Sequence, residues 1–412
     1  MNRVVVTGLG IVSCIGNNQS DVINSLKDLK SGITSAEEYE EFSFRSLVHG
    51  KPNIDISNEI DRRLLRFMGD GAAYAYLSMQ QAINDSGLEN KDVSNVKSGL
   101  VVGSGGPSTS NMMKSFDTAR EKSPKRVGPY MVPKCMSSTV SANLANSFEI
   151  KGLNFSITSA CSTSAHCITV GSDAIRNGTQ DIIFAGGGEE IHWSLSVLFD
   201  AMAALSSKYN ETPTLSSRPY DRDRDGFVIS GGGGIIVLEE LEHAKARGAK
   251  IYGELLGYGA NSDGFDMVAP SGEGAERCMS LAMKGFDGKG INQKVRYING
   301  HGTSTPVGDV AELKAINNLF GDQTEMPLLT STKSLTGHSQ GATGVQEAIY
   351  TLIMMNKNFI SANSNLSEPD VNIGKIKIPE SLISDFSHEA CLSNSFGFGG
   401  TNACLALGKY FN

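Results

Sequence analysis

Short runs of apolar residues that end in glycine clusters recur along the chain. The clearest cover residues 4–10, 99–106 and 181–188. Runs of this length bounded by turn residues are typical of buried strands that close in tight turns. Apolar residues at helical spacing separate them, as in residues 72–86. This alternation predicts an α/β protein in which strands are packed between layers of helices.

The second half of the chain repeats the pattern of the first. Four segments share this similarity: 251–257 with 4–10, 295–303 with the turn at Gly103, 329–334 with the approach to Cys161, and 391–400 with the glycines near Gly232. A helix predicted over residues 240–247 ends at Gly248, which marks a boundary between them. We therefore predict two duplicated βα halves, 1–248 and 249–412, whose strand ends share one face.

Residues 154–166 place a cysteine where a strand pattern gives way to a helical one. The segment before Cys161 alternates, and Ile168 and Ile175 belong to the helical spacing after it. Free amides at a helix start favour a thiolate, and small neighbours leave the sulfur reachable. A nucleophilic cysteine needs this setting. The competing interpretation is a small buried packing residue, which is what most cysteines among apolar neighbours are.

Two further turns carry reactive side chains. His301 lies in the turn after the apolar run at 295–299, and Lys333 and His338 lie in the turn after 329–332. The paired Glu189 and Glu190 could serve acid–base chemistry, but a structural hydrogen-bonding role is the preferred interpretation. The remaining histidines that lack such a setting are interpreted as packed or surface groups: His49, His192, His243 and His388.

Composition and charge exclude several classes of protein. The chain has 412 residues and a net charge of −8, which argues against general nucleic-acid binding. Its 7 cysteines form no Cys-x-x-Cys pair, so neither a zinc site nor a disulfide framework is predicted. No run approaches the ~18 apolar residues of a membrane span, and the start does not resemble a signal peptide. We expect a soluble, cytoplasmic protein without a membrane partner.

Four motifs resemble those of one enzyme family. They cover residues 158–167, 300–309, 333–338 and 394–402. Together they resemble the β-ketoacyl-acyl-carrier-protein synthases, which have the thiolase fold, and the resemblance extends over essentially the whole chain. It implies an α/β, thiolase-like fold with layers α/β/α/β/α. The glycine run at 231–234, Arg62-Arg63 and residues 165–167 resemble the type I branch, and the type II branch is the alternative.

The resemblance implies a decarboxylative condensation that lengthens a fatty acyl chain by two carbons. Cys161 would hold the acyl group as a thioester, and the backbone amides of Cys161 and Phe398 would form an oxyanion hole. The Phe398 ring would gate the pocket. His301 and His338 would donate hydrogen bonds to the enolate that forms when malonyl-carrier protein loses carbon dioxide.

Supporting roles follow from the same resemblance. Lys333 would order and polarise the site, with Glu347 as its partner, and Thr303 and Thr305 would bind the pantetheine arm. No metal or redox cofactor is required. Relatives in this family sometimes hold a structural monovalent cation, at positions that match Asn299, Glu347, Ser393 and Asn394.

The expected partners are acyl carrier protein, bearing acyl or malonyl groups, and a second copy of the chain. A carrier protein is acidic, so a local basic patch on this acidic chain would suit its docking. An ordinary solvated helix face is the alternative interpretation of that patch. The patch consists of Arg62, Arg63, Arg66, Lys125 and Arg126.

Three rival functions remain open at this point. A thiolase would use a second cysteine as base, but Cys391 and Cys404 both lie outside the glycine turn around Phe398. A non-catalytic chain-length partner would lack the nucleophilic cysteine. A cysteine hydrolase would need a group that positions water, and none is recognisable.

Overall fold

Glycines in the first strand are needed for close helix packing. The computed structural model describes residues 1–411, and in it β1 (Val4–Val12) continues through Gly8 and Gly10. A Cβ atom at Gly10 would lie 1.8 Å from the carbonyl oxygen of Ser78 in α5 (Asp70–Ser86). The turn predicted at Gly10 is therefore wrong, because the glycines instead allow α5 to approach the strand.

Each half of the chain contributes five strands to one ten-stranded sheet, and the two sets of strands follow the same spatial order. The first half gives β5-β4-β6-β7-β1 and the second β10-β9-β13-β14-β8. The halves meet where β1 pairs with β8 through Val5 and Val6. The remaining strands of this ten-stranded sheet are β4 (Ser98–Gly103), β5 (Asn154–Ile157), β6 (Ile182–Glu189), β7 (Gly232–Glu240), β8 (Gly253–Ser262), β9 (Val295–Asn299), β10 (Leu328–Thr330), β13 (Ala390–Gly397) and β14 (Thr401–Gly408).

This strand order confirms the internal duplication and corrects one of the predicted matches. β13 takes the place in its half of the sheet that β6 takes in the first half, so residues 391–400 do not correspond to the segment near Gly232. Glycine clusters occur in both β6 and β7, and for that reason they do not identify equivalent strands. The boundary at residue 248 lies between α12 (Leu241–Ala246) and β8, and it stays a prediction.

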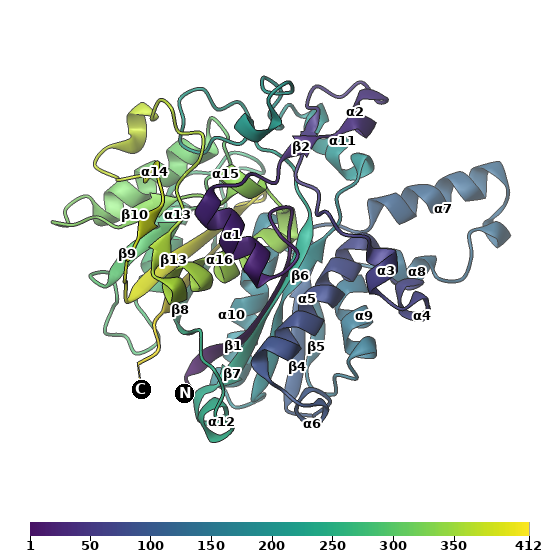
Figure 1. Cartoon of the computed structure of the whole chain (residues 1–412), viewed down its shortest axis with the longest axis horizontal. Helices are drawn as coiled ribbons and strands as arrows, with labels where there is room; N and C mark the ends of the chain where they lie inside the picture. The colour runs from purple at the N-terminus through teal and green to yellow at the C-terminus, as the bar shows by residue number, and fades with distance from the viewer. Residues whose placement is uncertain (412) are drawn as a thin grey trace.

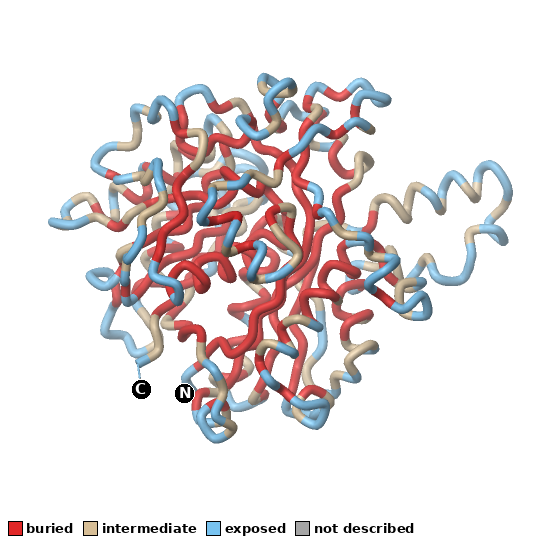
Figure 2. Tube along the Cα trace, in the orientation of Figure 1, coloured by how far each residue is buried: buried red, intermediate tan, exposed pale blue. Residues whose placement is uncertain are grey.

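Helices form three layers around the two halves of the sheet (Figure 1). α10 (Thr163–Arg176) and α16 (Thr343–Lys357) pack against each other in the middle layer. α5 and α9 (Thr139–Ser147) cover the outer face of the first half, while α13 (Glu273–Met283) and α14 (Gly308–Phe320) cover that of the second. The predicted α/β/α/β/α order is confirmed. The largest apolar cluster lies around the middle layer, where Figure 2 shows an almost continuous buried region.

One helix projects away from this body. α7 (Thr109–Glu121) has no buried residue and extends as an arm that ends in the short turn η1 (Pro124–Arg126) (Figures 1 and 2). Within residues 1–411, no helix is both long and apolar enough to cross a bilayer. The other elements are α1 (Gln19–Asp28), β2 (Thr34–Ser35), α2 (Glu37–Glu40), β3 (Val48–His49), α3 (Ile56–Glu59), α4 (Arg62–Leu65), α6 (Asn90–Val93), α8 (Met131–Cys135), η2 (Ala160–Ser162), α11 (Trp193–Ala201), η3 (Pro213–Leu215), α15 (Lys333–Thr336), η4 (Gln340–Ala342), β11 (Phe359–Ile360), η5 (Val371–Ile373) and β12 (Ile383–Ser384).

Candidate active site

Cys161 lies in a strained turn between a strand and a helix, as the sequence predicts. The turn η2 follows β5 and leads into α10. Ala160, directly before the cysteine, has φ of +49°, which an L-residue rarely adopts. The Ser162 hydroxyl donates to the carbonyl oxygens of Ser395 and Thr401, both at 2.8 Å. The second half of the chain therefore fixes the position of the turn that carries Cys161.

Burial disfavours the thiolate form of Cys161. Burial raises the pKa of Cys161 to about 11, while the positive charge of Lys333 and the backbone N–H of Phe398 act in the opposite direction. Burial therefore opposes the thiolate that the helix start favours. The same backbone N–H of Phe398 lies near the sulfur, where the predicted oxyanion hole requires it.

Two neutral histidines face the cysteine. The sulfur of Cys161 and a ring nitrogen from each of His301 and His338 all lie within 4.8 Å of one another. Burial, reinforced by the charge of Lys333, holds the pKa of both histidines well below the usual value. Among the described residues, no group hydrogen-bonds to Nδ1 of His301 or to either ring nitrogen of His338. These rings are therefore available to donate to an oxygen of a bound molecule.

A buried ion pair lies behind the histidines. Nζ of Lys333 donates to Oε1 of Glu347, and both side chains are at most 2% exposed. Burial raises the pKa of Glu347 to about 7, although the neighbouring ammonium lowers it. Cys161, His301 and His338 also offer the nitrogen and sulfur ligands that a soft metal ion uses.

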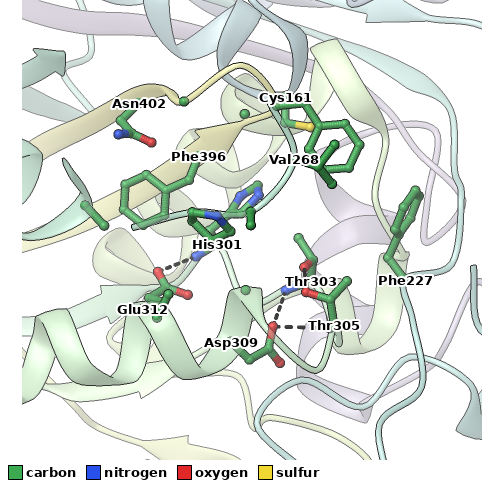
Figure 3. Close-up of a pocket in the computed structure, with 18 of the residues that line it drawn as sticks. Cys161, Phe227, Val268, His301, Thr303, Thr305, Asp309, Glu312, Phe396 and Asn402 are labelled. Carbon is green, nitrogen blue, oxygen red and sulfur yellow. Dashed lines mark hydrogen bonds between the residues drawn. The ribbon is translucent and has the colours of Figure 1, made fainter. Parts of the chain in front are cut away.

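Two carboxylates on α14 hold the turn that carries His301 (Figure 3). Glu312 accepts from the amides of His301 and Gly302, each at 2.8 Å, and Asp309 accepts from the amide of Thr303 at 3.0 Å. Both carboxylates are buried. Sequence reasoning missed them, although both occupy the apolar face of α14, where an acidic residue signals a buried partner.

The wall of the pocket is partly aromatic. Phe398 lies beside Phe199, with ring centroids 6.5 Å apart, and Phe227 packs edge-on against His338 at 5.6 Å. Gly399, next to Phe398, has φ of +81°, a conformation that favours glycine. These aromatic rings join Cys161 in lining one pocket, and the sequence did not indicate Phe199 or Phe227.

Polar residues line the other side of the same pocket. Thr303 and Thr305 both face it, and their hydroxyl oxygens lie 3.0 Å apart (Figure 3). The structure thus brings together the predicted nucleophile, both histidines, the gate and the two threonines. Lys333 and Glu347 lie behind them.

Other candidates lie outside this pocket. Glu189 accepts from the Ser104 hydroxyl and from the amides of Gly105 and Gly341, which confirms its structural role. Cys391 and Cys404 are fully buried in β13 and β14. The histidines interpreted as packed or surface groups do not line the pocket: His49, His192, His243 and His388.

The basic residues predicted for docking lie at the surface, away from the pocket lining. Arg66 stacks on the rings of Phe67 and Tyr130, at 4.8 and 5.1 Å, which places α4 beside the segment that follows η1. Arg63 pairs with Asp61 in an exposed salt bridge. All five basic side chains are exposed: Arg62, Arg63, Arg66, Lys125 and Arg126.

The residues suggested for a cation present several buried oxygens. Glu347 Oε2, Ser393 Oγ and Asn394 Oδ1 have no hydrogen-bond partner within the part of the chain that the structure describes. Asn299 lies nearby, with long hydrogen bonds of 3.4 and 3.5 Å to Thr332. Buried oxygens without partners are costly, and a hard cation would satisfy them. This donor set therefore fits a monovalent ion.

Comparison with known proteins identifies the family to which the chain belongs. The model of the β-ketoacyl synthase N-terminal domain matches residues 1–244, and that of the C-terminal domain matches residues 252–367. The chain belongs to the β-ketoacyl synthase family. It is 53% identical to 3-oxoacyl-acyl-carrier-protein synthase 1 of Haemophilus influenzae, over 100% of both chains.

Two further relatives define the position of the chain within the family. Identity to 3-oxoacyl-acyl-carrier-protein synthase 2 of Vibrio cholerae is 37%, over 98% of both chains. A crystal structure of a β-ketoacyl synthase from Burkholderia phymatum has a TM-score of 0.93 at 32% identity, over 100% of both chains. The similarity is therefore greater to the type 1 relative than to the type 2 relative, and the fold is that of the condensing enzymes.

Proposed function

We propose that the protein is a β-ketoacyl-acyl-carrier-protein synthase of type I, which extends fatty acyl chains by two carbons. The observation that carries this proposal is the convergence of Cys161 with two neutral histidines in one partly aromatic pocket. The identity of 53% to a type 1 synthase, against 37% to a type 2 synthase, favours this branch. An acyl carrier protein is the expected partner, because the names of both synthase relatives include it.

The first half-reaction transfers an acyl group to Cys161. The sulfur attacks the carbonyl carbon of the acyl thioester, and the carrier thiol leaves with the proton that Cys161 releases. Negative charge that develops on the carbonyl oxygen is stabilised by the backbone amides of Cys161 and Phe398.

The second half-reaction joins the two substrates. Malonyl-carrier protein loses carbon dioxide, and the electron pair of the broken bond forms an enolate whose oxygen accepts from His301 and His338. A neutral imidazole still carries one N–H, which it can donate to the enolate oxygen. The enolate carbon then attacks the acyl carbonyl on Cys161, and the sulfur leaves as a thiolate that takes a proton from solvent. Thr303 and Thr305 hold the pantetheine arm.

Mass spectrometry of the intact protein tests the first half-reaction. Mixing with acyl-carrier protein should add one acyl group, and digestion should locate it on Cys161. A Cys161→Ala variant serves as the control and should remain unmodified. An adduct on Cys391 or Cys404, or no adduct on any cysteine, would contradict the proposed function.

We propose that the five exposed basic residues form the docking patch for the carrier protein. Arg62→Glu combined with Arg66→Glu should raise KM for carrier-bound substrates, because surface charge acts on encounter and is screened within ~8 Å at physiological salt. Small thioester substrates should be affected little. Steady-state kinetics with both kinds of substrate measures the difference.

The control is a matched reversal of two exposed lysines in the second half, Lys289→Glu with Lys294→Glu. It changes net charge equally and should leave KM for carrier-bound substrates near its original value. Equal losses on carrier-bound and small substrates, or an equal effect of the control, would show that the patch has no docking role.

We propose a homodimer that covers the edge of the sheet and the projecting arm. β5 is an edge strand with an exposed pattern, and Phe155 within it is 37% exposed. An exposed edge strand is a template for pairing with another chain. The arm α7 exposes Phe116, and a 13-residue helix without buried contacts is marginal alone. Sedimentation should show a dimer, and a stable, active monomer would refute it.

We propose that Asn299, Glu347, Ser393 and Asn394 hold a structural monovalent cation. A bound ion stabilises the folded protein by mass action, so the thermal midpoint should rise with potassium or sodium chloride. Tetramethylammonium chloride at equal ionic strength is the control, because that ion is too large for the site. Equal midpoints in all three salts would contradict the proposal.

A further inference from the structure

Gln340 is a polar residue in an unusual position within the catalytic pocket. It begins the turn η4, is 7% exposed and lines the same pocket as Cys161. Its only side-chain hydrogen bond within residues 1–411 runs from Nε2 to the carbonyl oxygen of His338, at a long 3.4 Å. Donation to a carbonyl identifies the nitrogen end of the amide. Oε1 therefore accepts no hydrogen bond from the described part of the chain.

The duplicated fold shows that this side chain is not required by the turn. η4 precedes α16 as η2 precedes α10, so Gln340 corresponds to Ala160. Both residues have φ of +49°. A methyl group suffices at Ala160, whereas Gln340 combines the same backbone strain with an amide whose oxygen accepts no hydrogen bond from the described residues. Strain and an unpaired polar atom at one pocket residue point to a function.

The surroundings place Gln340 beside the first half of the chain. The amide of Gly341, the next residue, donates to Glu189 at 2.9 Å, and the same carboxylate holds the turn at Gly105. Apolar lining comes from both halves, with Phe199 and Phe227 from the first and Val268, Phe396 and Phe398 from the second, beside the polar Thr303 and Thr305. An acyl chain on Cys161 would lie against the apolar lining. Gln340 then offers a polar contact to that chain.

We propose that Gln340 is a specificity-determining residue for acyl groups that carry a hydroxyl on the chain. A hydroxyl is complementary because it donates to Oε1 and can accept from the second hydrogen of Nε2. A plain hydrocarbon chain bonds neither Oε1 nor the second hydrogen of Nε2, and so leaves the amide with only its bond to the His338 carbonyl. This inference rests on the proposed function and names a substrate class for it.

The test compares Gln340→Leu with the unchanged protein. Leucine removes the amide but keeps a side chain of similar reach and the same backbone strain, since both residues carry a Cβ. We would measure kcat/KM for acylation of Cys161 with a saturated acyl thioester, and with the same chain bearing one hydroxyl at successive carbons. The preference for a hydroxylated chain over the saturated chain should fall about tenfold for at least one hydroxyl position, the equivalent of one hydrogen bond.

Two controls make each outcome decisive. Ser339→Ala alters the neighbouring residue, whose hydroxyl bonds Gln346 away from the pocket, and should leave the preference unchanged. Malonyl decarboxylation needs no acyl chain, so it should be equal in the Gln340→Leu variant. An unchanged preference at every hydroxyl position would overturn the proposal. Equal losses of activity on all substrates, together with loss of decarboxylation, would also overturn it, because Gln340 would then only support the turn that carries His338.

Gln340→Met repeats the test with a flexible side chain if leucine prevents folding. Failure of the unchanged protein to acylate Cys161 with any substrate would instead refute the proposed function. The two failures are therefore distinguishable.

Discussion

Replacing Cys161 by glutamine should abolish acyl transfer while decarboxylation of malonyl-carrier protein persists or increases. Acyl transfer needs a nucleophile, whereas decarboxylation needs hydrogen-bond donors for a developing oxyanion. The glutamine carbonyl can occupy the oxyanion hole formed with Phe398 and so imitate the acyl thioester. Malonyl-carrier protein then meets a site that resembles the acyl-enzyme. Release of carbon dioxide and the absence of an acyl adduct measure the two effects.

Adding His338→Ala to that variant should reduce decarboxylation strongly. One lost oxyanion donor costs about 3 kcal/mol, or about a hundredfold in rate. The ring nitrogens of His338 have no hydrogen-bond partner among residues 1–411, so the substitution removes a hydrogen bond to the substrate and no structural hydrogen bond. His243→Ala is the matched control, because this half-exposed histidine bonds Glu239 on the far side of the fold.

The pH dependence offers a second readout of the same assignment. The pKa values of His301 and His338 lie well below 6.5, so both rings stay neutral across neutral pH. Decarboxylation by Cys161→Gln should therefore show no step near the usual histidine pKa. A step there, no carbon dioxide from Cys161→Gln, or no effect of His338→Ala would contradict the division of labour.

The sequence predicts the fold and the reacting groups well because their signals are local. Apolar runs with glycine ends mark the strands, and the motifs around Cys161, His301 and His338 each lie in one turn. The duplication then brings these turns to one face, since equivalent strands end at equivalent positions. Local pattern was misleading at Gly10, where a glycine that permits helix packing looked like a turn.

Other properties of the site depend on distant packing. The burial that raises the pKa of Cys161 depends on how the chain packs around it, and a helix-start pattern carries no information about that desolvation. The roles of Asp309 and Glu312 depend on which amides face them after folding. Their place on the apolar face of α14 was nevertheless visible in the sequence. The position of Gln340 in the pocket depends on the bond between Gly341 and Glu189, which are far apart in the chain.

Lys333→Met should destabilise the protein severely because it leaves Glu347 buried without its partner. Both side chains are at most 2% exposed, and breaking such a pair typically costs about 3–5 kcal/mol. Replacing both residues, as Lys333→Met with Glu347→Gln, should recover most of that loss, since no buried charge then remains. Chemical denaturation of the three proteins measures the change in the free energy of unfolding.

The loss in Lys333→Met should also grow as pH rises. Burial already raises the pKa of Glu347 to about 7 from its ordinary 4.5, and without the ammonium the pKa rises further. The folded state then keeps a proton that the unfolded state releases above pH ~4.5. The unchanged protein loses stability in the same way only up to about pH 7, so the additional loss in Lys333→Met grows above that pH. Adding Glu347→Gln should abolish this slope.

Lys289→Met, at an exposed lysine, is the control and should change stability by about 0.5 kcal/mol or less. If Lys333→Met is as stable as the unchanged protein, or if the double variant is no more stable than the single one, the ion pair does not hold the site together as argued.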